Sequence, residues 1–319
     1  MKKIILLFLL SAAIWAVPAS GPVDTIEING TAKDMVLDGD MLVVATDMGH
    51  IEIHDTVKKE KTKEISLPDV KDFMGDMMPA RVMSTDVIDG TYLLLSDSGK
   101  GGYANLFIYE NDTLKQLVDH NDRKPVIKAR FIDKTHILLG YLSNEVSLFD
   151  TVSKRELYKV QLSESKFSDF TLNEDKSQVV FSCESGILSV VDVKSGKILK
   201  ELEGQNVDNV YRVDFKSGMV SAAGQDRRGA LYDAKSGKGS YIEGHFLIYA
   251  TALSPSASKV AFAMDEKNNI SIYSTSSKSK IALLEGQKST LNVIIFKDEK
   301  KLFSASDDNT IMVWNLENK

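Results

Sequence analysis

The sequence predicts an all-β protein, a seven-bladed β-propeller with four antiparallel strands in each blade. The first observation is a repeat: a short apolar segment ending at a polar residue occurs seven times in 319 residues. The second is its spacing, because successive copies lie 55, 40, 42, 41, 41 and 41 residues apart. A period of about 40–45 residues that holds four short strands is typical of a propeller blade. The copies end at Asp55, Glu110, Asp150, Asp192, Asp233, Ser274 and Asn315.

The clearest copy of the repeat, GILSVVDVKSGK, runs from Gly186 to Lys197. Its apolar residues predict a strand that ends at Asp192, whose carboxylate can accept backbone N–H groups of the following turn. Gly196 supplies the positive φ that a tight hairpin requires. This segment is therefore expected to be scaffold.

The third observation is the order of strands within one interval. Runs of four to seven residues rich in Val, Ile, Phe and Tyr, with turns about every ten residues, indicate antiparallel β-structure. A solenoid has shorter coils, and a pair of β-sandwiches would not keep this period, so a propeller is favoured. The four strands expected in the fifth interval are 209–215, 219–223, 229–232 and 240–242.

The two ends of the chain predict how the ring closes. The last interval stops at Trp314-Asn315-Leu316, after its third strand. One unattached strand, Val23 to Asn29, precedes the first complete interval. We expect this N-terminal strand to become the outer strand of the last blade, because closure removes exposed sheet edges.

These repeats resemble the WD-repeat family over about residues 23 to 319. The last copy, SASDDNTIMVWN, carries Ser306, Asp308 and Trp314 where that family has its Ser, Asp and Trp, and Gly244-His245 is similar to its Gly-His pair. Other copies depart from the pattern, with Gly204-Gln205 and Gly286-Gln287 in place of Gly-His. The resemblance implies the propeller fold, while the buried hydrogen-bonded tetrad of the family is not expected.

The N-terminus predicts export. Lys2-Lys3 precedes the apolar run Ile4 to Trp15, and small residues follow, with cleavage expected after Ala16 or Ala19. Twelve apolar residues are too few to span a bilayer of about 30 Å, so a cleaved signal is favoured over an uncleaved anchor. We therefore expect a signal peptide over 1–19 and a single propeller domain over 20–319, located in a bacterial periplasm without a membrane span after cleavage.

Composition limits the classes of partner and of chemistry. A formal net charge of −6 argues against a nucleic-acid partner, which favours clustered positive charge. The one cysteine, Cys183, is interpreted as a buried, inert thiol. His50 and His54 flank a strand and lie about 13 Å apart along it, which argues against a shared metal. We expect no catalytic residue, no metal and no cofactor.

One interval is longer than the others. Its excess is the segment Pro68 to Ala80, PDVKDFMGDMMPA, and the next repeat has a long loop over Asp97 to Ala104. In a propeller these two kinds of loop open on the same face. The candidate partner-binding residues are Phe73, Met74, Met77, Met78, Lys100 and Tyr103, because adaptable Met and aromatic side chains suit protein-binding surfaces. The alternative is a loop that packs its own Met and Phe onto the ring.

A second group of candidates lies at the mouth of the channel. Lys128, Asp169 and Arg212 hold equivalent positions in successive innermost strands. One interpretation is a site for an anion or an acidic peptide at Lys128 and Arg212. The other is that Asp169 pairs with both cations.

The function expected from these features is that of a non-catalytic, monomeric scaffold that holds another periplasmic protein. The chain is similar to the WD-repeat accessory proteins encoded beside bacterial periplasmic nitrate reductases, and this resemblance implies a role in assembly or electron supply of such an enzyme. The alternative is a small-ligand sensor or a hydrolase that uses the channel mouth.

Overall fold

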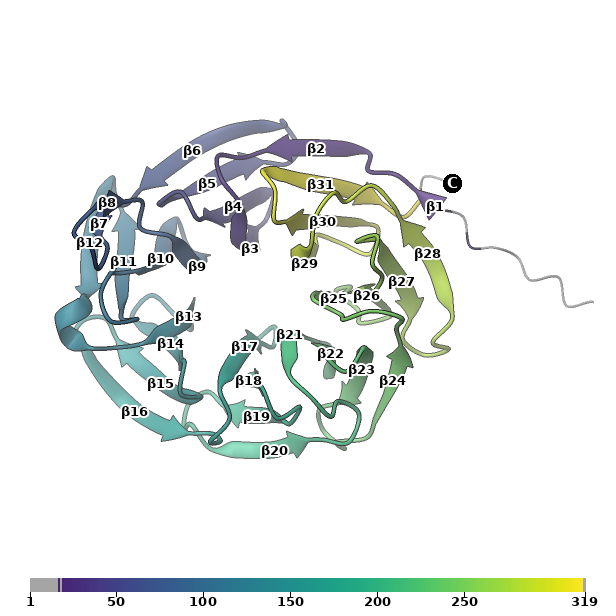
Figure 1. Cartoon of the computed structure of the whole chain (residues 1–319). Helices are drawn as coiled ribbons and strands as arrows, with labels where there is room; N and C mark the ends of the chain where they lie inside the picture. Colours follow the sequence, from purple (N-terminus) through teal and green to yellow (C-terminus); the bar gives the residue numbers. More distant parts are fainter. Residues whose placement is uncertain (1–16, 18, 318–319) are drawn as a thin grey trace, which may run out of the picture.

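The computed structural model describes residues 17 and 19–317, and it shows a ring of seven blades around a central channel, each built on four antiparallel strands (Figure 1). The predicted fold class is therefore confirmed. The predicted signal segment falls almost entirely on residues outside those described. The innermost strands of blades 1 to 7 are β3 (Ala32–Asp38), β9 (Val82–Ile88), β13 (Val126–Phe131), β17 (Phe167–Leu172), β21 (Val210–Lys216), β25 (Thr251–Leu253) and β29 (Leu291–Phe296).

In blades 1 to 6 four successive strands run outward as an antiparallel meander, whereas in blade 7 three successive strands do so and a strand from the N-terminal part of the chain completes the sheet. The second strands are β4 (Met41–Thr46), β10 (Thr91–Asp97), β14 (His136–Tyr141), β18 (Gln178–Cys183), β22 (Met219–Gly224), β26 (Lys259–Ala263) and β30 (Lys301–Ser306). The third strands are β5 (His50–Asp55), β11 (Ala104–Glu110), β15 (Glu145–Asp150), β19 (Leu188–Asp192), β23 (Arg228–Asp233), β27 (Ile270–Ser274) and β31 (Thr310–Asn315). The outer strands are β6 (Glu60–Ser66), β12 (Thr113–Val118), β16 (Arg155–Gln161), β20 (Ile198–Leu202), β24 (Gly239–Glu243), β28 (Lys280–Leu284) and, in blade 7, β2 (Asp24–Glu27).

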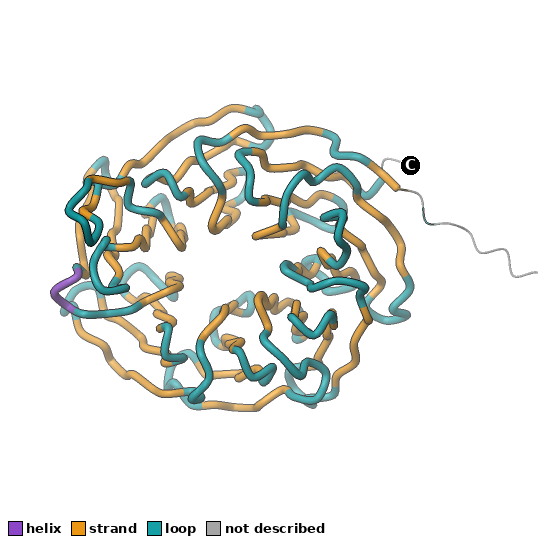
Figure 2. The backbone as a smooth tube through the Cα atoms, in the orientation of Figure 1, coloured by secondary structure: helices purple, strands orange, loops and turns teal. Residues whose placement is uncertain are grey.

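Three short elements lie between neighbouring blades. β7 (Val70–Lys71) and β8 (Met77–Met78) form a two-stranded hairpin between blades 1 and 2. The 3₁₀ turn η1 (His120–Asp122) is the purple segment between blades 2 and 3 in Figure 2. No helix within residues 19–317 is long and apolar enough to cross a membrane.

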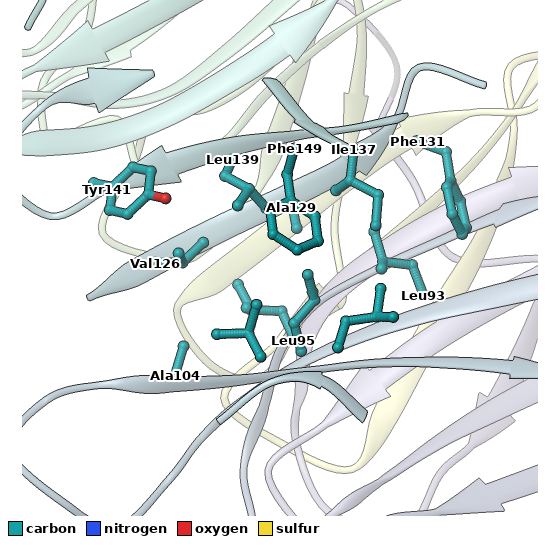
Figure 3. Packing of buried hydrophobic residues seen from close by; sticks show 13 residues of the cluster. Leu93, Leu95, Ala104, Val126, Ala129, Phe131, Ile137, Leu139, Tyr141 and Phe149 are labelled. Atoms are coloured by element: carbon teal, nitrogen blue, oxygen red, sulfur yellow. The ribbon is translucent and has the colours of Figure 1, made fainter. Parts of the chain in front are cut away.

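The core lies between neighbouring blades. The middle strands are buried on both faces because a blade packs against one on each side, and this explains why they read as nearly continuous apolar runs. Figure 3 shows the layer between blades 2 and 3, where Leu93 and Leu95 of β10 face Ala129, Ile137 and Leu139. The outer strands alternate between exposed and half-buried residues, as in β16, because one of their faces meets solvent.

The N-terminal strand closes the ring, as the sequence predicts. β2 pairs with β31 in antiparallel register, with Asp24 opposite Val313. Figure 1 shows it along the outer edge of blade 7. The Val23 amide adds a bond of 2.8 Å to the Val313 carbonyl, so the pairing extends beyond the strand itself. One addition was not expected: β1 (Ala19–Ser20) pairs in parallel with β28 as a fifth strand of blade 6.

Buried and half-buried aspartates join the innermost strands to one another across the blades. Asp34 of blade 1 accepts the Thr85 amide of blade 2 at 3.0 Å, and Asp86 of blade 2 accepts the Phe131 amide of blade 3 at 2.8 Å. Asp214 of blade 5 does the same for blade 6. The innermost strand of each blade has no neighbouring strand on the channel side, so its N–H groups on that edge lack a partner within the sheet. These carboxylates accept such N–H groups.

One of these aspartates forms a buried ion pair that sequence analysis missed. Arg130 of β13 donates to both carboxylate oxygens of Asp34, at 2.7 and 2.8 Å, and also to the Ser84 hydroxyl. Burial raises the pKa of Asp34, but the positive charges of Arg130 and Lys128 outweigh it and hold that pKa below its ordinary value. Asp86 lies in the same channel with its pKa raised, because burial dominates there.

The first prediction concerns closure. Ile28 follows β2 and is buried between blades 7 and 1. Ile28→Ala leaves a cavity at this seam, and we expect it to lower the free energy of unfolding by about 2–5 kcal/mol. Val57→Ala is the control, since Val57 is exposed and its loss should change stability by less than about 0.5 kcal/mol. Urea unfolding measures both, and equal effects would contradict the assigned role of the seam.

The second prediction concerns the ion pair. Arg130→Gln leaves Asp34 buried without its cation, and we expect a loss of about 3–5 kcal/mol at pH 7. A carboxyl with a lowered pKa contributes stability above its unfolded pKa and loses that contribution as pH falls. The difference between wild type and variant should therefore shrink below about pH 4.

Urea unfolding at pH 7 and at pH 3.5 measures this difference. Lys134→Gln is the control, because Lys134 forms an exposed pair with Asp89 that should be worth less than about 1 kcal/mol. A penalty for Arg130→Gln that stays constant between the two pH values would disprove the linkage.

Candidate functional site

The hairpin between blades 1 and 2 is held in shape by its own turn. β7 and β8 pair with Val70 opposite Met78 and Lys71 opposite Met77. The carboxylate of Asp72 accepts the amides of Met74 and Asp76 at 2.8 and 2.9 Å. Gly75, with a φ of 95°, provides the backbone conformation that the turn needs. The tip is thus an organised turn that presents two large side chains.

Those side chains point into solvent. Phe73 is 92% exposed and Met74 is 72% exposed, and Met77 and Met78 are also exposed. Sequence analysis left open whether this segment packs its own Met and Phe onto the ring, and the structure places all four outside the core. Exposed apolar side chains gathered in one place mark interaction sites on soluble proteins.

The long loop of blade 2 packs directly against the hairpin. Gly99 approaches the backbone of Lys71 so closely that an ideal Cβ at position 99 would lie 2.2 Å from the Lys71 carbonyl oxygen. A side chain at this position would separate the two loops, so glycine is required. Of the predicted loop residues, Lys100 is exposed and Tyr103 is half-buried. The two enlarged loops form one surface, as the sequence predicts.

One exposed methionine near the base of the hairpin is not among the predicted residues. Met48 lies in the turn between β4 and β5 and is exposed. Its neighbour Gly49 lies against Pro79 and Ala80, at the base of the hairpin. The sequence could have indicated Met48, because the turn that contains it joins the second and third strands of blade 1 and therefore opens on the same face as the long loop of blade 2. We call the group of Phe73, Met74, Met77, Met78, Lys100 and Tyr103 the blade 1–2 surface.

The channel-mouth candidates meet in the structure. Asp169 accepts from Lys128 at 2.6 Å and from Arg212 at 3.5 Å, and it also accepts the Val213 amide at 3.2 Å. Burial lowers the pKa of Lys128, and the positive charges of Arg130 and Arg212 add to this effect while Asp169 opposes it. This is the pairing that sequence analysis set against an anion site, and it compensates both cations within the chain. The adjoining channel cavity has a volume of about 380 Å³.

The last blade contains a buried hydrogen-bonded network that sequence analysis did not expect. The Trp314 indole donates to the Ser304 hydroxyl at 2.8 Å, and Ser304 donates to the Gln287 carbonyl oxygen at 2.7 Å. The Gln287 amide then donates to Ser306, which donates to Asp308. Gln287 supplies both a donor and an acceptor, so it can replace a histidine in such a chain. The Gly-Gln departure therefore does not abolish the network here.

The Gly-His pair of blade 6 behaves differently. His245 is exposed, although Gly244-His245 is similar in sequence to the family's pair. In blade 5 the corresponding amide is Asn206, which follows Gln205 and bonds to Asp226 at 3.3 Å. Sequence similarity at this position is thus a poor guide to which side chain is buried.

The two strand-flanking histidines both contact one glutamate. His50 lies 3.3 Å and His54 lies 2.8 Å from the carboxylate of Glu52, which sits between them. The backbones of His50 and His54 are as far apart along the strand as the sequence predicts. Their rings nevertheless reach one common side chain, Glu52, because it lies between them on the same face of the strand. All three residues are buried.

Comparison with known proteins supports the fold. No family model matches the chain, and no curated protein matches it. The β-propeller domain of Myceliophteria thermophila Cps50 (Swd1) superimposes with a TM-score of 0.72 at 14% identity, covering 92% of this chain and 98% of that one. A chain of the mitotic checkpoint complex superimposes with a TM-score of 0.76 at 15% identity, covering 99% of both. The fold of this chain is therefore that of a WD-repeat-like seven-bladed β-propeller.

Proposed function

We propose that this protein is a non-catalytic scaffold that binds a partner protein on the blade 1–2 surface. The observation that carries the proposal is the exposure of Phe73 and Met74 on a turn that Asp72 holds in place. Because the backbone of this turn is already ordered, a partner that covers its large apolar side chains pays little additional backbone conformational entropy. Met and aromatic residues are also enriched at protein interfaces.

The fold is consistent with this role. Propellers of the WD-repeat type are typical protein-interaction scaffolds, and loops on a rigid frame are where binding residues concentrate. One structural neighbour was solved as part of a complex, the mitotic checkpoint complex. The pairing of Asp169 with Lys128 and Arg212 weakens the alternative of a small-ligand sensor or hydrolase, since that alternative needs these cations for a ligand.

The finer proposal concerns the partner and its compartment. We infer an exported, monomeric periplasmic protein of the NapL kind, whose partner is a component of a periplasmic nitrate reductase that it helps to assemble or to supply with electrons. The basic and apolar N-terminal segment and the resemblance to accessory WD-repeat proteins support this inference. Fractionation of the native cell and N-terminal sequencing of the exported form test the compartment and the cleavage point.

The third prediction tests the surface by photo-crosslinking. A benzoylphenylalanine that replaces Phe73 should crosslink the partner in intact cells grown on nitrate, and mass spectrometry of the adduct identifies it. The same probe in place of Val152 is the control, because Val152 is 78% exposed but lies in the turn between β15 and β16 of blade 3. Adducts of equal yield at both positions, or none at position 73, would refute the proposed surface.

The identity of the adduct separates the two levels of the proposal. A nitrate reductase component supports the finer proposal. A different protein retains the scaffold function and rejects the nitrate reductase role. Once the partner is known, Phe73→Ser with Met74→Ser should weaken its binding at least tenfold, since a hot-spot aromatic residue commonly contributes about 2 kcal/mol or more.

The fourth prediction concerns preorganisation of the tip. Asp72→Ala removes two hydrogen bonds, both accepted by one carboxylate oxygen of Asp72, but leaves Phe73 and Met74 in the chain. We expect partner affinity to fall about three- to tenfold through the cost of ordering the tip, with little change in the melting temperature of the ring. Asp69→Ala, in the same segment, is the matched control. Unchanged affinity for Asp72→Ala would show that the turn need not be ordered before binding.

A further inference from the structure

Blade 1 carries an unusual polar face in its third strand. His50, Glu52 and His54 alternate along β5 and therefore share one face, which is buried. Glu52 is only 1% exposed. Repeat alignment places Phe107, Ser147, Ser189, Ala230, Ser271 and Met312 at its position in the other six blades. The propeller frame thus does not require a carboxylate here, and the group needs another explanation.

A second carboxylate lies opposite the first. Glu64 of β6 is the direct cross-strand partner of Glu52, and like charges in this arrangement destabilise a sheet unless a cation compensates them. One ligand atom each from His50, Glu52 and Glu64 can be chosen so that all lie within 4.8 Å of one another. Neighbouring ligands of a tetrahedral metal with bonds of about 2.1 Å are about 3.4 Å apart, so small side-chain rotations would bring the three into place.

The ring of His50 is oriented for such a site. Its Nδ1 lies 3.1 Å from the Met48 carbonyl oxygen, which can only accept, so Nδ1 carries a proton. The neutral ring then has its lone pair on Nε2, the atom that faces Glu52 at 3.3 Å. A backbone carbonyl that fixes the tautomer in this way is the usual second-shell partner of a metal-binding histidine.

Glu52 is held from two further sides. The Asn29 amide, just beyond the closing strand β2, donates to one carboxylate oxygen at 2.9 Å, and His54 lies 2.8 Å from the other. The cation now beside the two carboxylates is Lys61, at 2.7 Å from Glu64 and 3.8 Å from Glu52. Its side chain is 43% exposed, so it can turn into solvent and leave this position to another cation.

We propose that His50, Glu52 and Glu64 form a binding site for a divalent first-row transition metal, with zinc as its representative. Imidazole nitrogen with carboxylate oxygen suits zinc, and three protein ligands leave one coordination position for solvent. His54 orients Glu52 from outside the ligand set. A cavity of about 580 Å³, lined by His54, Lys61 and strand β2, borders the site on the side of these two side chains.

The site would strengthen the ring at its seam. Glu52 belongs to blade 1, and its bonded partner Asn29 follows the strand that completes blade 7. A metal that fixes Glu52 therefore also fixes the end of β2. Zinc should slow amide hydrogen exchange over residues 23–29, a segment that contains none of the ligands.

The test uses the untagged mature protein, stripped with chelator and titrated with Zn²⁺ by calorimetry. We expect one zinc per chain, no comparable binding of Mg²⁺, and a rise in melting temperature with zinc. His50→Gln should abolish binding, and Glu64→Gln should weaken it at least tenfold. Because Glu64 is exposed, Glu64→Gln remains informative even if His50→Gln fails to fold.

The matched control is Glu201→Gln. Glu201 is the exposed cross-strand partner of Ser189, so it occupies in blade 4 the place that Glu64 occupies in blade 1. This variant should bind zinc like the wild type. Absence of stoichiometric zinc binding would overturn the proposal, as would binding that Glu64→Gln and Glu201→Gln affect equally. None of these outcomes depends on the blade 1–2 surface.

Discussion

Coverage of strand edges is the constraint on which the whole ring depends. A sheet ends in unpaired N–H and C=O groups, and a ring of separate blades has two such edges per blade. At the channel, the carboxylates of the buried Asp34 and the half-buried Asp86 accept N–H groups of the next blade. At the seam, β2 completes blade 7 from the other end of the chain. Closure of the ring therefore joins the first and the last strands of the propeller in one sheet.

The distance to the nearest cation explains why the pKa values of two neighbouring aspartates shift in opposite directions, since burial raises both. Asp34 has the guanidinium of Arg130 against both of its oxygens, so its pKa falls despite burial. Asp86 has only backbone amides at hydrogen-bonding distance among the contacts described, and burial raises its pKa. A carboxylate can thus accept the N–H groups of the strand edge in either case. The free-energy cost of burying its charge depends on the nearest cation.

The rigid ring allows two departures from the repeat. The hairpin at 68–80 adds no core, yet it is locked to blade 2 where Gly99 meets Lys71. Glu52 departs in the opposite sense, since it introduces charge into a buried strand where other blades have small or apolar residues. Departures that a scaffold does not require are where function is expected. One is an exposed apolar surface, and the other is a buried polar site.

The sequence by itself determined the fold, the number of blades, the closing strand and the position of the enlarged loops, because these follow from periodicity and turn chemistry along the chain. Only the tertiary structure decided that Phe73 and Met74 face solvent, that Asp169 lies between Lys128 and Arg212, and that Gln287 links Ser304 to Ser306. It also brought Glu52 between His50 and His54, and Arg130 onto Asp34. Such contacts depend on the distances between side chains that belong to different strands and blades. The order of residue types along the chain does not contain these distances.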